Sequence, residues 1–353
     1  MKLHSRAPTR IDLAGGTVDI WPIYLLAERA CTINLGINLF AEADLHFSEE
    51  GDEVLLQSAD QGHELRFRWK DLPQLKTVPQ LELHAKLLRH FVEETNGKIG
   101  RGTLTLRTQA KSPAGAGLGG SSTLSVAMIG ALATWARGKI NPETEGDALV
   151  EITRDIETTV IRVPAGVQDY YAAMHGGLQS LHWGVSRHKR ESFAPALLAP
   201  LQNRLALFYS GQSRNSGINN WALYKSYIDG ENKVRERFAQ IIAATHELGA
   251  ALRTNDWQGV REAIHREWTA RRTLAAEIST PAMDQAFALC EKDFGGTGKI
   301  CGAGGGGCFF LYLPSDDLEK KNKLIERVLR KTGDAVRLLD FQAVPHGLEV
   351  NAR

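Results

Sequence analysis

The alternation of apolar and polar positions predicts a sheet in the first third of the chain. Residues 35–47 carry an apolar side chain at every second position, which is the period of a half-buried strand. Segments 53–58 and 63–69 repeat the pattern. In the last segment the side chains expected to face the core are Leu65, Phe67 and Trp69. Together these segments predict a meander of antiparallel strands.

A change to helical spacing marks most of the remaining elements. Residues 81–95 read as an amphipathic helix, and the apolar run 123–137 reads as a buried one. Asn141-Pro142 begins another helix, which carries Glu157 near its end. The second half is expected to contain a strand at 204–211, helices over 217–293, and then a hairpin, a helix and a strand at 299–313, 317–331 and 335–341. The stretch 184–200 is the best candidate boundary, which predicts domains at 1–195 and 196–353.

Composition limits the classes of function. The chain has 353 residues, 43% hydrophobic and 24% charged, with a formal net charge of +1. These values are typical of a globular enzyme, and they argue against nucleic acid or an anionic membrane as the main partner. No apolar stretch approaches the length of a membrane span, and the first residues lack a signal-peptide core, so we expect a cytoplasmic protein. The four cysteines form no CxxC pair. The sequence leaves the oligomeric state open, a homodimer included.

A glycine-rich stretch, KSPAGAGLGGSST at 111–123, has the composition of a phosphate cradle. Its glycines let backbone N–H groups approach an anion, and the helix that follows directs its N-terminus at the same place. Ser121 and Ser122 offer hydroxyls to a polyphosphate or to its metal. The loop also matches in part the GxGxxG pattern of dinucleotide-binding proteins and a Walker A loop without its lysine. A nicotinamide oxidoreductase, which would bind NADH, therefore stays an alternative, although a purely structural turn would also fit.

Three motifs occur in a fixed order: RAPTRIDLAGGTVD, SPAGAGLGGSS and CGAGGGGC. They resemble the three signature motifs of the GHMP kinases, a superfamily that includes galactokinase, homoserine kinase, mevalonate kinase and phosphomevalonate kinase. Within the superfamily, the heptose 7-phosphate kinases and their sugar-kinase relatives are most similar in three stretches: RAP-x-R-x-x-LAGG-x-x-D, GVQDYYAA-x-x-GG and SGQSRNSG. The resemblance implies a two-domain α+β fold, with an N-terminal domain like domain 2 of ribosomal protein S5, a C-terminal ferredoxin-like α/β sandwich, and the active site between them. It also implies ATP and Mg²⁺ as cofactors and a small-molecule sugar or sugar phosphate as the partner.

The resemblance implies roles for individual residues. It makes Asp169 the catalytic base and Arg10 its catalytic partner, and it gives Mg²⁺ to Glu157 and Ser121, with Ser122 as the alternative hydroxyl. Substrate contacts are expected from Gly16, Thr17, Asp19 and Arg214. The residues expected around ATP are Pro113, Gly115, Gly117, Leu118, Gly119, Gly120, Ser121 and Ser122.

Phosphoryl transfer requires mainly positioning and neutralisation of charge, and a sugar hydroxyl needs an acceptor for its proton. Asp169 would take that proton, and Arg10 would keep the carboxylate ionised. Heptose 7-phosphate is the first expected acceptor, and a neutral sugar, a sugar acid or mevalonate stay open. A non-catalytic sugar or nucleotide sensor of the same fold is the alternative of another class. Simpler interpretations are a surface ion pair for Arg10, a helix cap for Asp19 and a solvated loop arginine for Arg214.

Overall fold

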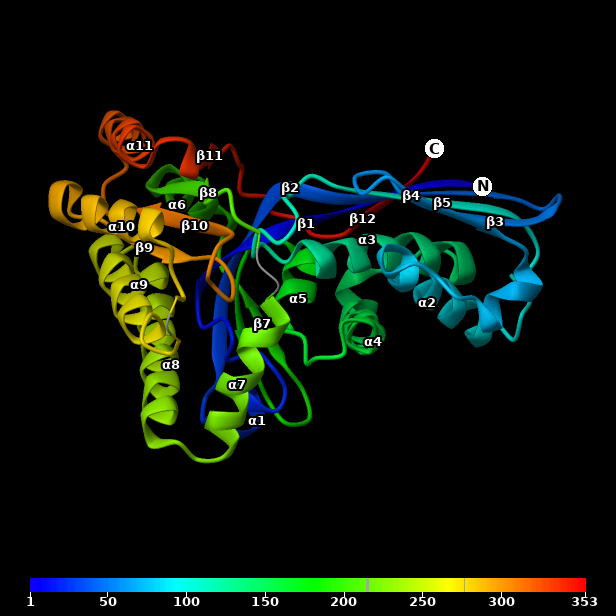
Figure 1. Ribbon diagram of the computed structural model, residues 1–353, viewed down its shortest axis with the longest axis horizontal. Helices are drawn as coiled ribbons and strands as arrows, with labels where there is room; N and C mark the ends of the chain where they lie inside the picture. The colour runs from blue at the N-terminus through cyan, green and yellow to red at the C-terminus, as the bar shows by residue number, and fades with distance from the viewer. Residues whose placement is uncertain (214–215, 276) are drawn as a thin grey trace.

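The structure, a computed structural model, describes residues 1–213, 216–275 and 277–353. Arg214, one of the expected substrate residues, lies outside the described residues. The described chain folds into two sheets with helices packed around them, so the expected α+β class is confirmed (Figure 1).

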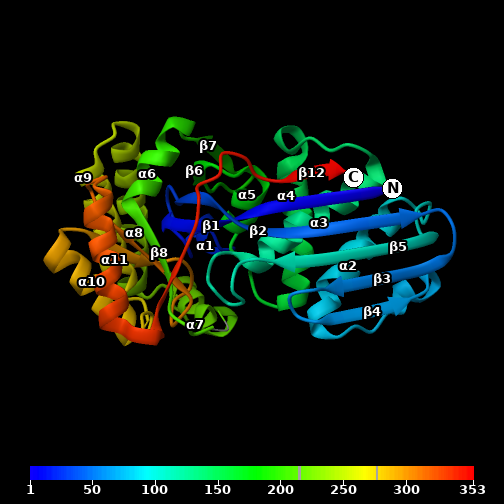
Figure 2. The ribbon, with the colours of Figure 1, turned by 90° about the horizontal axis from the view of Figure 1, so that it is seen from above.

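The first sheet is built mainly from the first third of the chain. Its main path runs β12-β1-β2-β5-β3-β4, and Figure 2 shows these strands side by side. A shorter arm is added where β6 pairs with β2 and β7 pairs with β6. The bounds are β1 Lys2–Ala14, β2 Cys31–Ser48, β3 Asp52–Ser58, β4 His63–Phe67, β5 Gly102–Ala110, β6 Leu178–His182, β7 Lys189–Ser192 and β12 Glu349–Ala352.

The predicted antiparallel meander is wrong in one respect. Strand β5 lies between β2 and β3, and it is parallel to β3. The chain leaves β4 through η1 (Trp69–Gln74) and helix α2 (Pro79–Glu94) and then returns beside β3. A helical crossover of this kind joins parallel strands, whereas a meander needs tight turns. The side chains predicted to face the core do so, since Phe67 and Trp69 are buried and Leu65 is half-buried.

Helices α2, α3 (Gly120–Arg137) and α4 (Pro142–Ile161) lie along one face of the first sheet (Figure 1). Every residue of α3 from Ser122 to Ala133 is buried, so the expected buried helix is confirmed. Helix α4 begins at the predicted Asn141-Pro142, where the Asn141 side chain accepts a hydrogen bond from the Glu143 backbone N–H. The short helices α1 (Ile23–Leu26) and α5 (Gln168–His175) precede β2 and β6.

The second sheet belongs to the second half of the chain and runs β11-β8-β10-β9. Strands β9 and β10 pair antiparallel around a run of glycines, as the predicted hairpin requires. The strand bounds are β8 Leu205–Tyr209, β9 Thr297–Ile300, β10 Cys308–Tyr312 and β11 Arg337–Leu339. The helix bounds are η2 Pro195–Leu197, α6 Leu198–Arg204, α7 Ser216–Ile228, α8 Asn232–Arg253, α9 Trp257–Arg271, α10 Pro281–Phe294, α11 Leu318–Thr332 and η3 Gly333–Ala335.

The two ends of the chain meet in the first sheet. Strand β12 pairs antiparallel with β1, and the two termini lie close together in both views (Figures 1 and 2). The last residues thus join the sheet that the first residues began, and a boundary at residue 195 stays a prediction. None of the helices in the described part of the chain combines the length and the apolar character that a membrane crossing requires.

Candidate functional site

The phosphate loop lies between the end of β5 and the start of α3. Gly115, Gly117 and Gly119 all have a positive φ, between 66° and 75°, which a residue with a Cβ rarely adopts. Gly119 is the N-cap of α3, and it has no side chain that could occupy the free N–H groups of the first turn. A helix N-terminus left open in this way is suited to binding an anion.

The glycine run after β9 packs directly on the phosphate loop. A Cβ on Gly302 would lie 2.8 Å from the Gly117 Cα, and a Cβ on Gly307 would lie 2.8 Å from the Ala116 carbonyl oxygen. The Cys308 N–H donates to that same oxygen, at 2.6 Å. These glycines are therefore required by the close approach of two backbones. The third motif braces the phosphate loop from the second sheet, as the resemblance implied.

Arg10, in the first motif, hydrogen-bonds to residues of the second and third motifs. Its Nε and Nη2 atoms lie 2.8 and 2.7 Å from Asp169 Oδ1, and Nη1 donates to the carbonyl oxygens of Gly117, at 2.6 Å, and Cys301, at 2.8 Å. The Arg10 backbone N–H also donates to the Leu118 carbonyl oxygen. Arg10 is buried, so the interpretation as a surface ion pair is wrong.

Asp169 lies against the start of α3. A Cβ on Gly119 would lie 2.9 Å from the Asp169 Cγ, so the carboxylate borders the phosphate loop. Burial raises the pKa of Asp169, and the adjacent Arg10 guanidinium opposes that rise. A carboxylate and its paired cation thus lie beside the open N-terminus of α3.

Asp19 is buried near Asp169, and among the described residues its carboxylate accepts one backbone hydrogen bond, from the Gln168 N–H at 3.0 Å. Burial and the Asp169 carboxylate raise the pKa of Asp19 to about 7. A helix cap would accept from the start of α1, whereas Asp19 accepts from the start of α5. A buried carboxylate with so few donors is suited to a ligand that brings hydroxyl groups.

The raised pKa of Asp19 makes the stability of the protein depend on pH. Since the folded value of about 7 exceeds the ordinary 3.8, the folded state keeps a proton that the unfolded chain has lost. The loss of stability that comes from ionising buried Asp19 is absent below the ordinary pKa, grows as the pH rises and is complete above about pH 7.

We expect Asp19→Asn to stabilise the protein relative to wild type, and this difference in unfolding free energy should be ~2 kcal/mol larger at about pH 8 than at about pH 5. Urea denaturation at both pH values measures this. The exposed Asp71→Asn is the control, and a pH-independent difference for Asp19→Asn would contradict the assignment.

Glu157 and Ser121 meet beside the phosphate loop. The exposed Ser121 hydroxyl donates to Glu157 Oε1 at 2.6 Å, and Ser125 donates to Oε2 at 3.1 Å. Burial raises the pKa of Glu157, against hydrogen bonds led by that from Ser121. Ser122 is buried. Within the described residues no three His, Cys, Asp or Glu side chains gather as a metal site, so a cation here would need oxygens from a ligand.

Sequence reasoning missed several polar residues of the site. Ser125 follows Ser121 by one helical turn, a spacing that could have indicated it. Tyr170 is buried, and burial and the Glu157 charge raise the pKa of its hydroxyl well above the usual range. Tyr224 of α7 is also buried, and no hydrogen-bond partner for its hydroxyl lies among the described residues. The sequence marks Tyr170 only as a departure from the related sugar kinases, many of which have Gln at this position, and no pattern in the sequence indicates Tyr224.

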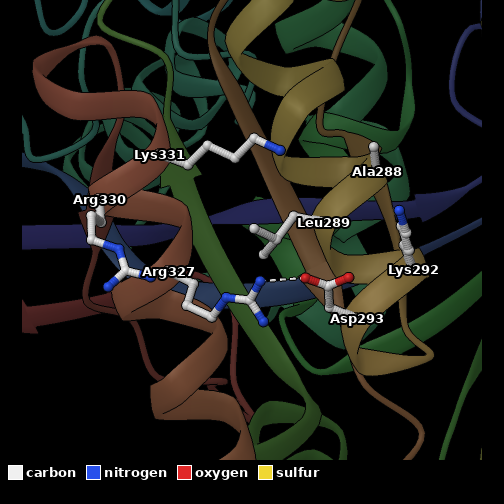
Figure 3. Close-up of a pocket in the computed structure, with 7 residues that line it drawn as sticks. All are labelled: Ala288, Leu289, Lys292, Asp293, Arg327, Arg330 and Lys331. Carbon is white, nitrogen blue, oxygen red and sulfur yellow. Dashed lines mark hydrogen bonds and ion pairs between the residues drawn. The ribbon is translucent and has the colours of Figure 1, made fainter.

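A basic groove of about 440 Å³ lies apart from this site, between α10 and α11 (Figure 3). Lys331 extends from α11 toward α10, and Arg327 pairs with Asp293 across the groove. The lining residues are Ala288, Leu289, Lys292, Asp293, Arg327, Arg330 and Lys331. It shares no residue with the three motifs and is not part of the candidate site.

The chain is similar in sequence or fold to several sugar kinases. A D-glycero-alpha-D-manno-heptose 7-phosphate kinase of Campylobacter jejuni is 25% identical over 352 residues, which cover 98% of each chain. A solved D-glycero-D-manno-heptose 1-phosphate kinase of Bacteroides thetaiotaomicron has the same fold, with a TM-score of 0.78 at 18% identity over 99% of each chain. Lactococcus lactis galactokinase, solved with galactose, gives a TM-score of 0.77 at 14% identity over 99% of this chain and 95% of that one.

Two family models match the chain in order. The model described as the GHMP kinases N terminal domain matches residues 82–177, and the one described as GHMP kinases C terminal matches residues 239–335. The first contains the phosphate loop, Glu157 and Asp169, and the second contains the glycine run that braces the loop. The two-domain kinase fold accounts for the GxGxxG match of the phosphate loop without a nicotinamide site. The chain belongs to the GHMP kinases.

Proposed function

We propose that this protein is an ATP- and Mg²⁺-dependent kinase that transfers the terminal phosphate of ATP to a hydroxyl of a sugar or sugar phosphate. The observation that supports this most is the contact of the Asp169 carboxylate, held by Arg10, with the Gly119 end of the phosphate loop. An acceptor hydroxyl that hydrogen-bonds Asp169 would be close to a phosphate bound at the N-terminus of α3. Proximity of this kind is the main requirement of phosphoryl transfer.

The residues of the chain supply the remaining chemistry. Asp169 takes the proton of the acceptor hydroxyl as the oxygen of that hydroxyl attacks the terminal phosphorus of ATP. Arg10 favours the ionised form of Asp169 and, through Gly117 and Cys301, keeps it aligned with the loop. Asp19 accepts a hydrogen bond from a second hydroxyl of the sugar and so orients the sugar ring. These roles need a polyhydroxylated acceptor, because one carboxylate orients and the other accepts the proton.

Ser121 and Glu157 have the donor chemistry that Mg²⁺ requires. Both present oxygen, and burial raises the pKa of the Glu157 carboxyl, so a cation beside it would favour the ionised form. Mg²⁺ bound there would neutralise charge on the phosphate oxygens. The chain's own contribution is to hold the carboxylate with Ser125, at 3.1 Å, so that Glu157 keeps its orientation.

Removing either oxygen should raise the Mg²⁺ requirement. We expect Ser121→Ala and Glu157→Gln to increase the Mg²⁺ concentration for half-maximal activity by about tenfold, since each removes one hard ligand. A magnesium titration of ADP release at saturating ATP measures the change. Glu151→Gln, on the exposed side of the same helix, is the control. An unaltered titration in both site variants would remove Ser121 and Glu157 from the metal site.

Heptose 7-phosphate is the proposed acceptor, supported by the relative from Campylobacter jejuni that matches the chain nearly end to end. A panel of heptose 7-phosphate, galactose, fucose, glucuronate and mevalonate, assayed by ADP release, tests it. The highest kcat/KM is expected with heptose 7-phosphate. A higher value for any other member would assign that acceptor instead, and ATP binding without turnover on the whole panel would favour a sensor.

A further inference from the structure

Four charged side chains are buried together behind the first motif. Asp12, Glu267, Arg271 and Lys299 are each at most 1% exposed. Lys299 Nζ lies 2.8 Å from Asp12 Oδ2 and 3.7 Å from Glu267 Oε1, and Arg271 Nη2 lies 2.6 Å from that same Glu267 oxygen. The two cations and two anions balance. They come from β1, α9 and β9, so this buried charge cluster joins the first sheet to the second half of the chain.

Two members of the cluster, Arg271 and Glu267, hydrogen-bond to the turn that follows β1. Arg271 Nη2 donates to the Gly16 carbonyl oxygen at 2.7 Å, and Nη1 donates to Thr17 Oγ1 at 3.1 Å. Glu267 Oε1 accepts from the Gly15 N–H at 3.2 Å. Three successive residues of the turn are therefore held by two side chains of α9.

The turn needs these hydrogen bonds because part of its backbone has an unfavourable conformation. Thr17 has a φ of 71°, and a β-branched residue rarely adopts that region. Gly16 is also confined, since a Cβ there would lie 2.1 Å from Asp12 Oδ2. A strained backbone persists only where its surroundings fix it, and here the fixing groups are Arg271 and Glu267.

The same turn carries Asp19. The Asp19 carbonyl oxygen accepts from the Val167 N–H and its carboxylate accepts from the Gln168 N–H, beside Asp169. The conformation at Gly16 and Thr17 thus sets the place of the carboxylate that would orient the acceptor. A buried ion pair contributes little net stability compared with apolar side chains, so its value here is the geometry that it imposes.

We propose that Arg271, oriented by Glu267, is a positioning residue that holds the Gly15–Asp19 turn in its acceptor-binding conformation. The second half of the chain thereby controls the acceptor site without touching the acceptor. This inference rests on the proposed function only for the identity of the ligand, since the contacts between Arg271 and the turn are structural.

Arg271→Lys tests the proposal kinetically. Lysine keeps the charge but cannot reach Gly16, Thr17 and Glu267 at once, because it lacks the planar fork of arginine. We expect the KM for the acceptor to rise about tenfold, while kcat and the KM for ATP change by less than about threefold. Arg272→Lys, the next and exposed residue, is the control. An equal rise in both KM values, or a loss of thermal stability with both KM values unchanged, would overturn the proposal.

Hydrogen exchange tests the turn without any acceptor. In Arg271→Lys the amides of residues 15–19 should exchange about tenfold faster, while those of 115–122 keep their rates. Adding Thr17→Gly should reduce the effect of Arg271→Lys, because glycine adopts the positive φ without strain. If the amides of residues 15–19 exchanged at the same rate in Arg271→Lys and in wild type, the proposal would be overturned, even if no acceptor is phosphorylated. Wild type that phosphorylates no acceptor, with faster exchange in the variant, would refute the proposed function alone.

Discussion

Asp169→Asn is expected to lower kcat about a thousandfold, because an amide cannot accept the proton of the acceptor hydroxyl. The affinity for ATP should hold, since the proposed binding of ATP by backbone N–H groups of the phosphate loop does not involve this side chain and asparagine keeps its size. Single-turnover measurements of ADP formation and titration of a fluorescent ATP analogue separate the two quantities. The wild-type rate should also fall as the medium is acidified, and at a higher pH than an ordinary aspartate would give, because burial raises the pKa of Asp169.

The matched control is Asp155→Asn, on the exposed side of α4. It should leave kcat and ATP affinity within about twofold of wild type, as surface carboxylates usually do. If Asp169→Asn kept more than about a tenth of the wild-type kcat, Asp169 would not be the base. If it lost ATP binding instead, the carboxylate would serve only to hold the phosphate loop.

Lys299→Met is expected to lower the free energy of unfolding by about 3 to 5 kcal/mol, the usual cost of removing one partner from a buried ion pair. Lys299 is fully buried, and its Nζ donates to Asp12 Oδ2, at 2.8 Å, and to the Asp12 carbonyl oxygen, at 3.0 Å. Methionine would fill the space and leave the Asp12 carboxylate without its cation. Urea denaturation followed by circular dichroism measures the difference.

Two further variants make this result specific. Lys292→Met, at an exposed position on α10, should cost less than about 0.5 kcal/mol. Adding Asp12→Asn to Lys299→Met removes the unpaired charge, so the double variant should be more stable than Lys299→Met alone. A double variant that is less stable by the sum of the two single losses would show that the pair is not coupled.

The sequence was sufficient to predict the glycine-rich loop and the second run of glycines, for a physical reason. Gly117 and the glycines after Cys301 approach another backbone, and Gly119 approaches the Asp169 side chain, so a larger residue at these positions would clash and the glycines leave a pattern that can be read without a structure. The alternation of β2 and the apolar run of α3 are equally direct, because burial on one face or on all faces fixes the period. The order of strands was not readable, since the insertion of β5 depends on a crossover through α2.

The buried charge cluster could not have been predicted in full. Asp12 lies between Ile11 and Leu13 in a strand, and a charge beside two buried apolar residues is a signal that could have drawn attention to it. Glu267 and Arg271 are four residues apart on α9, where such pairs usually face solvent. Nothing local distinguishes a buried pair of this kind, because its burial depends on the packing of α9 against the turn after β1.

The central claim is that the site transfers phosphate from ATP to a sugar hydroxyl, and product analysis tests it most directly. Wild-type protein would be incubated with Mg·ATP and heptose 7-phosphate, and ADP and phosphorylated heptose would be quantified together by mass spectrometry. We predict equal amounts of the two products, formed only when the acceptor is present and absent with Asp169→Asn. ADP formed at the same rate without any acceptor, or an Asp169→Asn variant as productive as wild type, would contradict the claim.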